Sequence, residues 1–115
     1  MRRGEVRLVE LDPGRGSEAR KRRPGIVVSN DHANAAAARL GRGVVTIIPV
    51  TRNVSRVLPF QVLLPEGSAG LRVASKAQAE QVRSVAVERI GPALGRLPAS
   101  LMTALDQALR LHLDL

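Results

Sequence analysis

The apolar residues of this chain fall into short runs interrupted by proline, glycine and polar residues, and this pattern restricts the fold to short elements. The strongest run is Val44–Thr51, whose β-branched residues predict a strand. Pro49 cannot donate to a strand ladder, so we expect an edge, a bulge or a strand end there, with the side chains just beyond it leaving the sheet. Further strands are predicted at Val6–Leu11, Ile26–Ser29 and Phe60–Leu64, and weaker strand or short-helix candidates lie at Leu71–Val73 and Ala77–Val87.

Helical spacing occurs in two places. Asn30 or Asp31 can cap a short helix that runs through Ala33–Leu40 and ends at Gly41. Pro98 suits the first position of a second, amphipathic helix, in which leucine recurs every fourth residue at positions 101, 105, 109 and 113. Five to seven short strands with one strong terminal helix predict an α+β fold built on a small twisted sheet or barrel.

Length and composition exclude several classes of protein. The 115 residues predict one domain, residues 1–115. The sequence contains no run of about 18 apolar residues, and its first residues lack the apolar segment of a signal peptide. The absence of cysteine removes disulfides and thiolate metal sites and suits a cytoplasmic protein. No cluster of His, Asp and Glu has the spacing of metal ligands, so we expect neither a metal nor another cofactor.

The charge of the chain is unevenly distributed. The formal net charge is +8, and 12 of the 18 Lys and Arg residues fall within residues 1–56. This imbalance predicts an anionic partner for the N-terminal half, either nucleic acid or an acidic peptide, with codon bias toward arginine as a competing explanation. Phe60 is the only aromatic residue, which argues against domains that stack RNA bases on aromatic side chains.

A basic loop contains the strongest candidates for chemistry. It carries Glu18 and four consecutive cations at positions 20–23, and Pro24 disfavours a helical conformation at Arg23. We therefore expect Arg23 to be extended and held by the following strand, where it can bind a phosphate with defined geometry. With the Thr51 hydroxyl and Glu18 as a base, it would provide a minimal site for RNA cleavage by the RNA's own 2′-hydroxyl. Taken singly, each of these residue types is also common in structural roles.

Six sequence blocks occur in the order of a known family and cover most of the chain up to the C-terminal helix. Through them the chain resembles the MazF/PemK family of toxin endoribonucleases. The blocks are Arg3–Val6, Leu11–Glu18, Arg23–Asn30, Pro49–Thr51, Pro59–Val62 and Glu80–Val85. The resemblance implies an SH3-like barrel of the CcdB/PemK type, a homodimer, and metal-independent cleavage of single-stranded RNA that leaves a 2′,3′-cyclic phosphate and a 5′-hydroxyl. It also implies inhibition by an antitoxin of the MazE/PemI type, whose acidic C-terminal segment would cover the same groove.

The resemblance also implies roles for individual residues. Arg23 matches the family's principal catalytic residue, Thr51 matches the residue that contacts the scissile phosphate, and Glu18 is a candidate general base. Because a guanidinium stays protonated in proteins, we interpret Arg23 as a charge stabiliser. Arg7 departs from the family pattern, in which a large apolar or aromatic residue is usual. The predicted RNA-binding residues are Ser17, Arg20, Lys21, Arg22, Asn30, Asn53, Ser75, Glu80 and Gln81.

Two other functions fit parts of the sequence. A non-catalytic, gyrase-poisoning toxin of the CcdB type would share the fold, but that branch relies on a C-terminal Trp-Gly-Ile, whereas this chain ends in Leu113-Asp114-Leu115. A passive nucleic-acid-binding barrel would share the basic loop and lack catalysis. The presence of both Arg23 and Thr51 argues against this passive barrel.

Replacing Arg20 by alanine is expected to weaken RNA binding and to flatten its salt dependence, because one loop cation no longer displaces a counterion from the RNA. The slope of the logarithm of the binding constant against the logarithm of the salt concentration should fall in magnitude by about 0.7 for a single-stranded substrate. The single-turnover rate at saturating RNA should change little. A slope equal to that of the wild type would refute the electrostatic role.

Overall fold

A computed structural model describes residues 1–11 and 21–115 of the chain. Within these residues the chain forms seven strands and two α-helices, which confirms the α+β class. The strands are β1 (Glu5–Glu10), β2 (Arg22–Val27), β3 (Val44–Thr51), β4 (Gln61–Leu64), β5 (Ser75–Gln78), β6 (Arg83–Ala86) and β7 (Ile90–Arg96). The helices are α1 (Asp31–Leu40) and α2 (Ala99–Leu113), with short 3-10 helices η1 (Ser68–Gly70), η2 (Ala79–Gln81) and η3 (Val87–Arg89).

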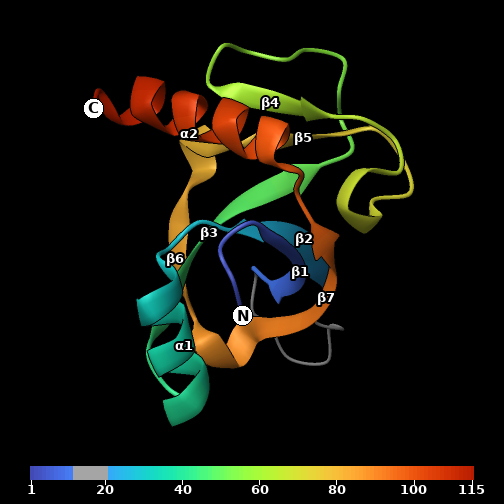
Figure 1. The fold of residues 1–115 in the computed structure, drawn as a ribbon. Coiled ribbons are helices and arrows are strands. Elements are labelled where there is room, and N and C mark those ends of the chain that lie inside the picture. Colours follow the sequence, from blue (N-terminus) through green and yellow to red (C-terminus); the bar gives the residue numbers. More distant parts are fainter. Residues whose placement is uncertain (12–20) are drawn as a thin grey trace.

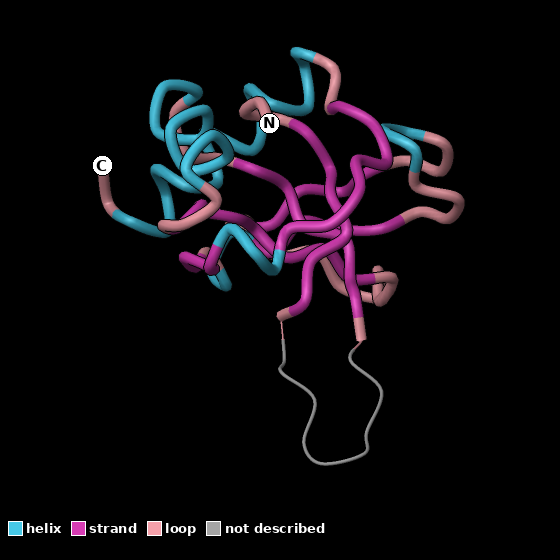
Figure 2. Tube along the Cα trace, turned by 90° about the horizontal axis from the view of Figure 1, so that it is seen from below, coloured by secondary structure: helices cyan, strands magenta, loops and turns pink. Residues whose placement is uncertain are grey.

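The strands form one antiparallel sheet in the order β4-β5-β3-β2-β1-β7, and β6 pairs with β3 as well. The sheet is strongly curved, α2 crosses it beside β4 and β5, and α1 lies next to β6 (Figure 1). In the view from below, strands occupy the middle of the molecule and the helices lie at its outside (Figure 2). The strand β3 is the centre of this arrangement, because it pairs with β2, β5 and β6.

The central strand β3 changes its partner on one side at Pro49. Its first half pairs with β6, ending at Ile47, and its last two residues, Val50 and Thr51, pair with β5. Pro49 lies opposite Gly25 of β2 on the other side, so its missing N–H falls where β3 passes from one partner to the next. The expectation that the side chains just beyond Pro49 leave the sheet is wrong for Val50, which pairs with Ala77 and is 6% exposed.

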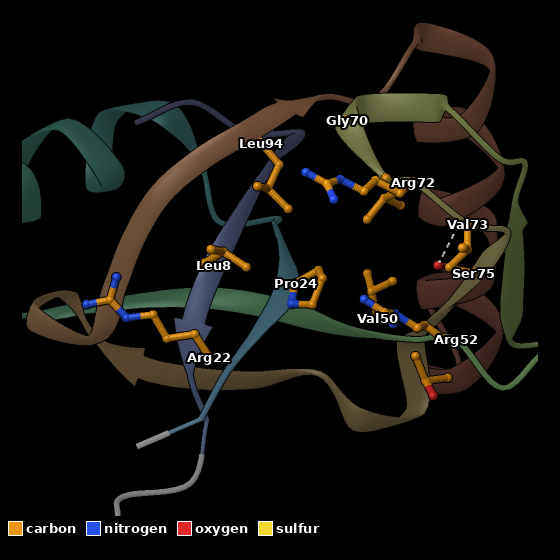
Figure 3. A pocket seen from close by; sticks show the side chains of 12 residues that line it. Leu8, Arg22, Pro24, Val50, Arg52, Gly70, Arg72, Val73, Ser75 and Leu94 are labelled. Carbon is orange, nitrogen blue, oxygen red and sulfur yellow. Dashed lines mark hydrogen bonds between the residues drawn. The ribbon is translucent and has the colours of Figure 1, made fainter. Parts of the chain in front are cut away.

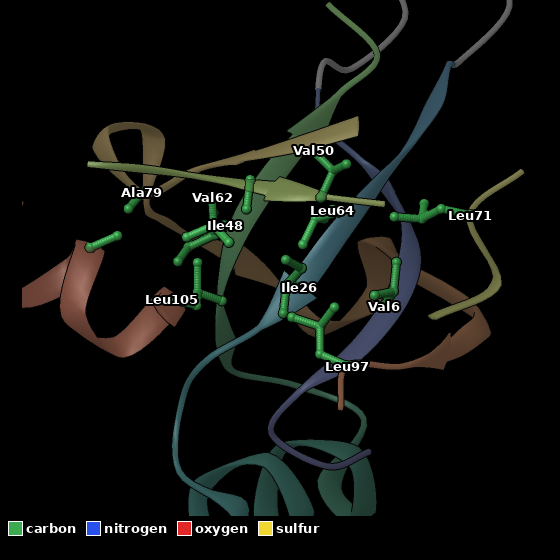
Figure 4. Close-up of a cluster of buried hydrophobic side chains, with 12 residues drawn as sticks. Val6, Ile26, Ile48, Val50, Val62, Leu64, Leu71, Ala79, Leu97 and Leu105 are labelled. Atoms are coloured by element: carbon green, nitrogen blue, oxygen red, sulfur yellow. The ribbon is translucent and has the colours of Figure 1, made fainter. Parts of the chain in front are cut away.

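The core consists of two clusters on the two sides of β3. Ile48 belongs to a cluster that fills the space between the sheet and α2, together with Ile26, Leu64 and Leu105 (Figure 4). Its neighbour Ile47 belongs to the second cluster, which Ala37 of α1 also joins. Because consecutive strand residues point to opposite faces, β3 is buried on both, which explains the continuous apolar run in its sequence.

The two α-helices follow the predicted pattern with small differences at their ends. The Asn30 side chain caps α1 by accepting a hydrogen bond of 2.8 Å from Ala33 N, and Gly41 ends the helix in the left-handed region. In α2, Leu105 is fully buried, whereas Leu113 is 49% exposed, so the apolar face stops short of the last turn. Pro98 precedes the first helical residue instead of occupying it, because its ψ of 157° is extended.

The strand β7 was not predicted from the sequence. Its residues Ile90–Arg96 include two glycines and a proline, which normally interrupt a strand. Pairing with β1 nevertheless holds β7 in place, with two irregularities in the register. The candidate Ala77–Val87 resolves into the end of β5, η2, β6 and the start of η3. The candidate Leu71–Val73 is wrong, because these residues form neither a strand nor a helix and β5 begins only at Ser75.

The turn containing η1 lies directly against β7, and two glycines make this contact possible. A Cβ atom on Gly70 would overlap the main-chain oxygen of Leu94, and one on Gly95 would lie 2.5 Å from the main-chain carbon of Ala69. Real Cβ atoms do not approach other atoms so closely. The β4–β5 connection is therefore fixed to β7 by backbone contact, across a large separation in sequence.

Replacing Gly70 by alanine is expected to destabilise the fold more than the same change at Gly67. Both glycines have positive φ, +79° and +85°, so alanine introduces backbone strain of about 1–2 kcal/mol at either position. Only at Gly70 does the new methyl group also collide with β7, which should add about 1–3 kcal/mol. Urea denaturation of the two variants measures the difference. Equal midpoints would show that the contact does not stabilise the fold.

The side chain of Arg7 joins the first and last strands of the sheet. Its Nη1 donates a hydrogen bond of 2.9 Å to Glu5 Oε1, and its Nε donates one of 2.8 Å to the main-chain oxygen of Gly91. Partial burial of Glu5 raises the pKa of its carboxyl, but hydrogen bonds from Arg7 and from the Arg2 main chain, with nearby positive charge, outweigh burial. The pKa of Glu5 therefore lies below its ordinary value of 4.5.

Glu5→Gln is expected to make the stability of the protein less sensitive to acid. A carboxyl whose folded-state pKa is lowered stabilises the fold above pH 4.5, and this contribution disappears as the pH falls through the folded-state pKa. The wild type should therefore lose more free energy of unfolding than Glu5→Gln between pH 5 and about pH 3. Urea titrations at each pH measure this, with Glu66→Gln in an exposed turn as the control. Identical pH profiles for Glu5→Gln and the wild type would contradict the prediction.

Candidate functional site

The pairing of β2 with β3 brings the two main candidate residues together. The ladder pairs Val27 with Ile47 and ends with Gly25 opposite Pro49. Arg23 and Thr51 each lie two residues beyond this last pair, and they line the same cavity. A cavity of about 330 Å³ opens there, lined by Arg22, Arg23, Pro24, Val50, Thr51 and Arg52. We call this cavity the phosphate cavity.

Arg23 is fixed by its backbone and exposed at its side chain. It belongs to β2, as the extended conformation expected before Pro24 predicts, and pairs with Val9 of β1. The following residues Gly25 and Ile26 are buried, so the strand that holds Arg23 is anchored in the core. The position combines a rigid attachment with a side chain that can reach an anion from solvent.

Thr51 ends β3 with its hydroxyl in a defined orientation. It pairs with Lys76 of β5, and its Oγ1 accepts a hydrogen bond of 3.2 Å from Asn53 N. Because the hydroxyl accepts in this bond, its own proton remains able to donate. Asn53 uses its side-chain oxygen within the same turn, where it accepts a bond of 2.7 Å from Ser55 Oγ, so its predicted RNA contact would have to involve the amide nitrogen or a rearrangement.

Arg22 lines the phosphate cavity, but its guanidinium leads away from it. Its Nε lies 3.9 Å from Glu10 Oε1. Its Nη1 lies close to Gly91 of β7, because a Cβ atom added to that glycine would be only 2.9 Å away. Figure 3 shows the side chain extending away from Pro24. The three described cations of the run at positions 20–23 therefore differ in placement: Lys21 is exposed before β2, Arg22 turns toward β7, and Arg23 borders the cavity.

A second cavity of about 230 Å³ adjoins the first, and we call it the side pocket. It shares Arg22, Pro24, Val50, Thr51 and Arg52 with the phosphate cavity. Its remaining lining consists of Leu8, Gly70, Leu71, Arg72, Val73, Ser75 and Leu94 (Figure 3). Ser75, which was predicted to contact RNA, is 2% exposed, and its hydroxyl donates to Val73 O at 3.0 Å.

Three further predicted RNA-binding residues line neither cavity. Asn30 caps α1, Gln81 is exposed on η2, and Glu80 accepts a hydrogen bond of 2.5 Å from the side chain of Gln61. The other carboxylate oxygen of Glu80 is buried without a hydrogen-bond partner among the described residues. Their contact with RNA stays a prediction. Ser17, Glu18 and Arg20 lie outside the described residues.

Sequence reasoning missed two arginines that border the cavities. Arg52 follows Thr51 directly and lines both, and this adjacency was the available signal. Arg72 borders the side pocket from the β4–β5 connection, and no motif marks it. Neither cavity has a carboxylate among its lining residues in the described chain, so both carry an excess of positive charge suited to an anion.

Over residues 1–11 and 21–115, no group of three or more His, Asp or Glu side chains is arranged to hold a metal ion. No helix in the same part of the chain is long and apolar enough to cross a membrane.

Known proteins resemble the chain over its whole length. It is 60% identical over 115 residues to Endoribonuclease MazF9 of Mycobacterium tuberculosis, covering 100% of this chain and 98% of that protein. A solved endoribonuclease in complex with its cognate antitoxin from a mycobacterial species matches the fold with a TM-score of 0.79 at 22% identity, covering 100% and 96% of the two chains. A MazE–MazF structure from Deinococcus radiodurans matches with a TM-score of 0.78 at 25% identity and the same coverage.

The family assignment rests on both sequence and fold. A model of the PemK-like, MazF-like toxins of type II toxin–antitoxin systems matches residues 2–113. That range includes β2 and β3, which bring Arg23 and Thr51 to one cavity, and the helix α2 that closes the core. The chain therefore belongs to the PemK-like, MazF-like family of toxins.

Proposed function

We propose that this protein is an endoribonuclease toxin that cuts single-stranded RNA at the phosphate cavity. The observation that carries the proposal is the meeting of Arg23 and Thr51 in one positively charged cavity. The name of the relative that is 60% identical, an endoribonuclease, supports the same reaction. The expected products are a 2′,3′-cyclic phosphate and a 5′-hydroxyl.

The proposed reaction uses the RNA's own nucleophile. The 2′-oxygen forms a bond to the adjacent phosphorus, the bond from phosphorus to the 5′-oxygen breaks, and the leaving 5′-oxygen takes up a proton from solvent water. Negative charge grows on the non-bridging phosphate oxygens during this step, and donors aimed at them stabilise the transition state. We assign this role to the Arg23 guanidinium and the Thr51 hydroxyl, two of the donors among the residues that line the cavity. We assign Glu18 as the group that takes the 2′-hydroxyl proton.

No step of this scheme uses a metal ion or another cofactor. The charge that a metal would neutralise in other nucleases falls to arginine, whose planar fork matches two phosphate oxygens. Arg52 adds a second cation at the same cavity and at the side pocket. Lys21 and Arg20 would attract the RNA backbone through charge alone.

The proposal extends to the assembly of the protein. We propose one domain over residues 1–115, an SH3-like barrel that forms a homodimer in the cytoplasm and is inhibited by an antitoxin of the MazE/PemI type. Solved structures of similar fold, described as a toxin with its cognate antitoxin and as MazE–MazF, support this partner. The positive cavities suit the acidic C-terminal segment expected of such an antitoxin.

Arg23→Ala is expected to lower the cleavage rate by about 100- to 1,000-fold, because it removes one preorganised donor to the transition state. The melting temperature should stay close to that of the wild type, since the side chain is exposed. The assay incubates purified protein with single-stranded RNA in EDTA and maps the ends that form. Arg42→Ala, which removes an exposed arginine in the turn between α1 and β3, is the matched control.

Two results would contradict the proposed function. Products with a 3′-hydroxyl would exclude attack by the 2′-hydroxyl, and full activity of Arg23→Ala would exclude the proposed role of this residue. A passive RNA-binding protein would bind the RNA and produce no ends at all.

A further inference from the structure

The side pocket adjoins the proposed reaction site but takes no part in the chemistry. It shares Thr51 and Arg52 with the phosphate cavity, so a nucleotide whose phosphate lies at Arg23 would have a neighbouring group at the mouth of the side pocket. The volume of about 230 Å³ corresponds to roughly eight water molecules at about 30 Å³ each, which is room for a planar ring system.

The lining of the side pocket combines an apolar wall with guanidinium groups. Leu8, Pro24 and Leu94 approach it from β1, β2 and β7, while Leu71 closes it from the β4–β5 connection. In Figure 3 the Arg72 side chain reaches across the pocket toward Leu94. A nucleobase complements this lining. Its flat face can pack against the apolar wall, and the hydrogen-bond acceptors at its edge can bind the guanidinium donors.

The backbone that carries Arg72 is firmly held. Gly70 lies against the main chain of Leu94, and Leu71 is 5% exposed. Leu71 also forms main-chain hydrogen bonds in both directions, donating to Ser68 O at 2.9 Å and accepting from Gly67 N at 2.8 Å. A side chain on such a support can discriminate between ligands, because its donors are not free to follow any base.

We propose that the side pocket binds the base of a nucleotide flanking the scissile phosphate, and that Arg72 selects it. This inference rests on the proposed endoribonuclease function. Arginine only donates hydrogen bonds, and its planar fork matches two adjacent acceptors such as O6 and N7 of guanine. On adenine the N7 acceptor lies beside the N6 amino donor, so Arg72 should disfavour adenine. Arg72 is thus a specificity-determining residue, distinct in role from Arg23.

The test is the distribution of cut sites in a random single-stranded RNA pool, read by sequencing the 5′-hydroxyl ends. The wild type should disfavour adenine at one position flanking the cut. Arg72→Gln should reduce this preference about tenfold, in the range of one lost arginine–base contact. Arg42→Gln removes the same charge from an exposed turn outside both cavities and should retain the wild-type preference.

Two further variants test the same preference if the Arg72→Gln protein fails to fold or to cut RNA. Arg72→Lys keeps the charge without the planar fork, and Leu94→Ala widens the pocket while leaving Arg72 in place; both should relax the same position. Unchanged preferences in these variants would overturn the assignment and leave the proposed function intact. Unchanged cut sites with weakened binding of an acidic antitoxin segment would also overturn it, in favour of a protein ligand. A wild type that makes no ends would overturn both proposals.

Discussion

The missing N–H of Pro49 is the constraint on which the arrangement of the sheet and the site depends. A strand in the middle of a sheet normally needs every N–H for its ladder, and β3 meets this condition by exchanging β6 for β5 where the donor is absent. Beyond that point, the pairing of β3 with β2 also ends. The strands remain close enough to present Arg23 and Thr51 together, and they leave room for a substrate between them.

The arginines of this site differ in what supports them, and this difference separates their roles. Arg23 stands on a strand anchored in the core, and Arg72 on a turn held against β7. Arg22, next to Arg23 in sequence, points to the opposite side of β2 and approaches Glu10. Consecutive strand residues alternate in direction, so a run of cations cannot act as one group once the chain becomes extended.

The strand–helix pattern and the principal residue pair could be predicted from the sequence, because they depend on local preferences. Pro24 determines the geometry of Arg23, and the leucines of α2 repeat with the helical period. The strand β7 could not be predicted, because its glycines and proline oppose strand formation and only pairing with β1 holds it. The side pocket was equally hidden, since Leu8, Arg72 and Leu94 come from three distant segments that meet only after folding. The role of Glu18 stays a prediction.

The contact between Gly70 and Leu94 joins main-chain atoms, and it therefore places no demand on what the Leu94 side chain is. The two residues that form the wall and the donor of the side pocket, Leu94 and Arg72, can be exchanged while the turn stays seated on β7. In such a scaffold, the side chains that contact a ligand can change without altering the backbone contact that stabilises the fold. Substitutions at Arg72 and Leu94 would then change which base the side pocket accepts, while the backbone contact that holds the turn stays the same.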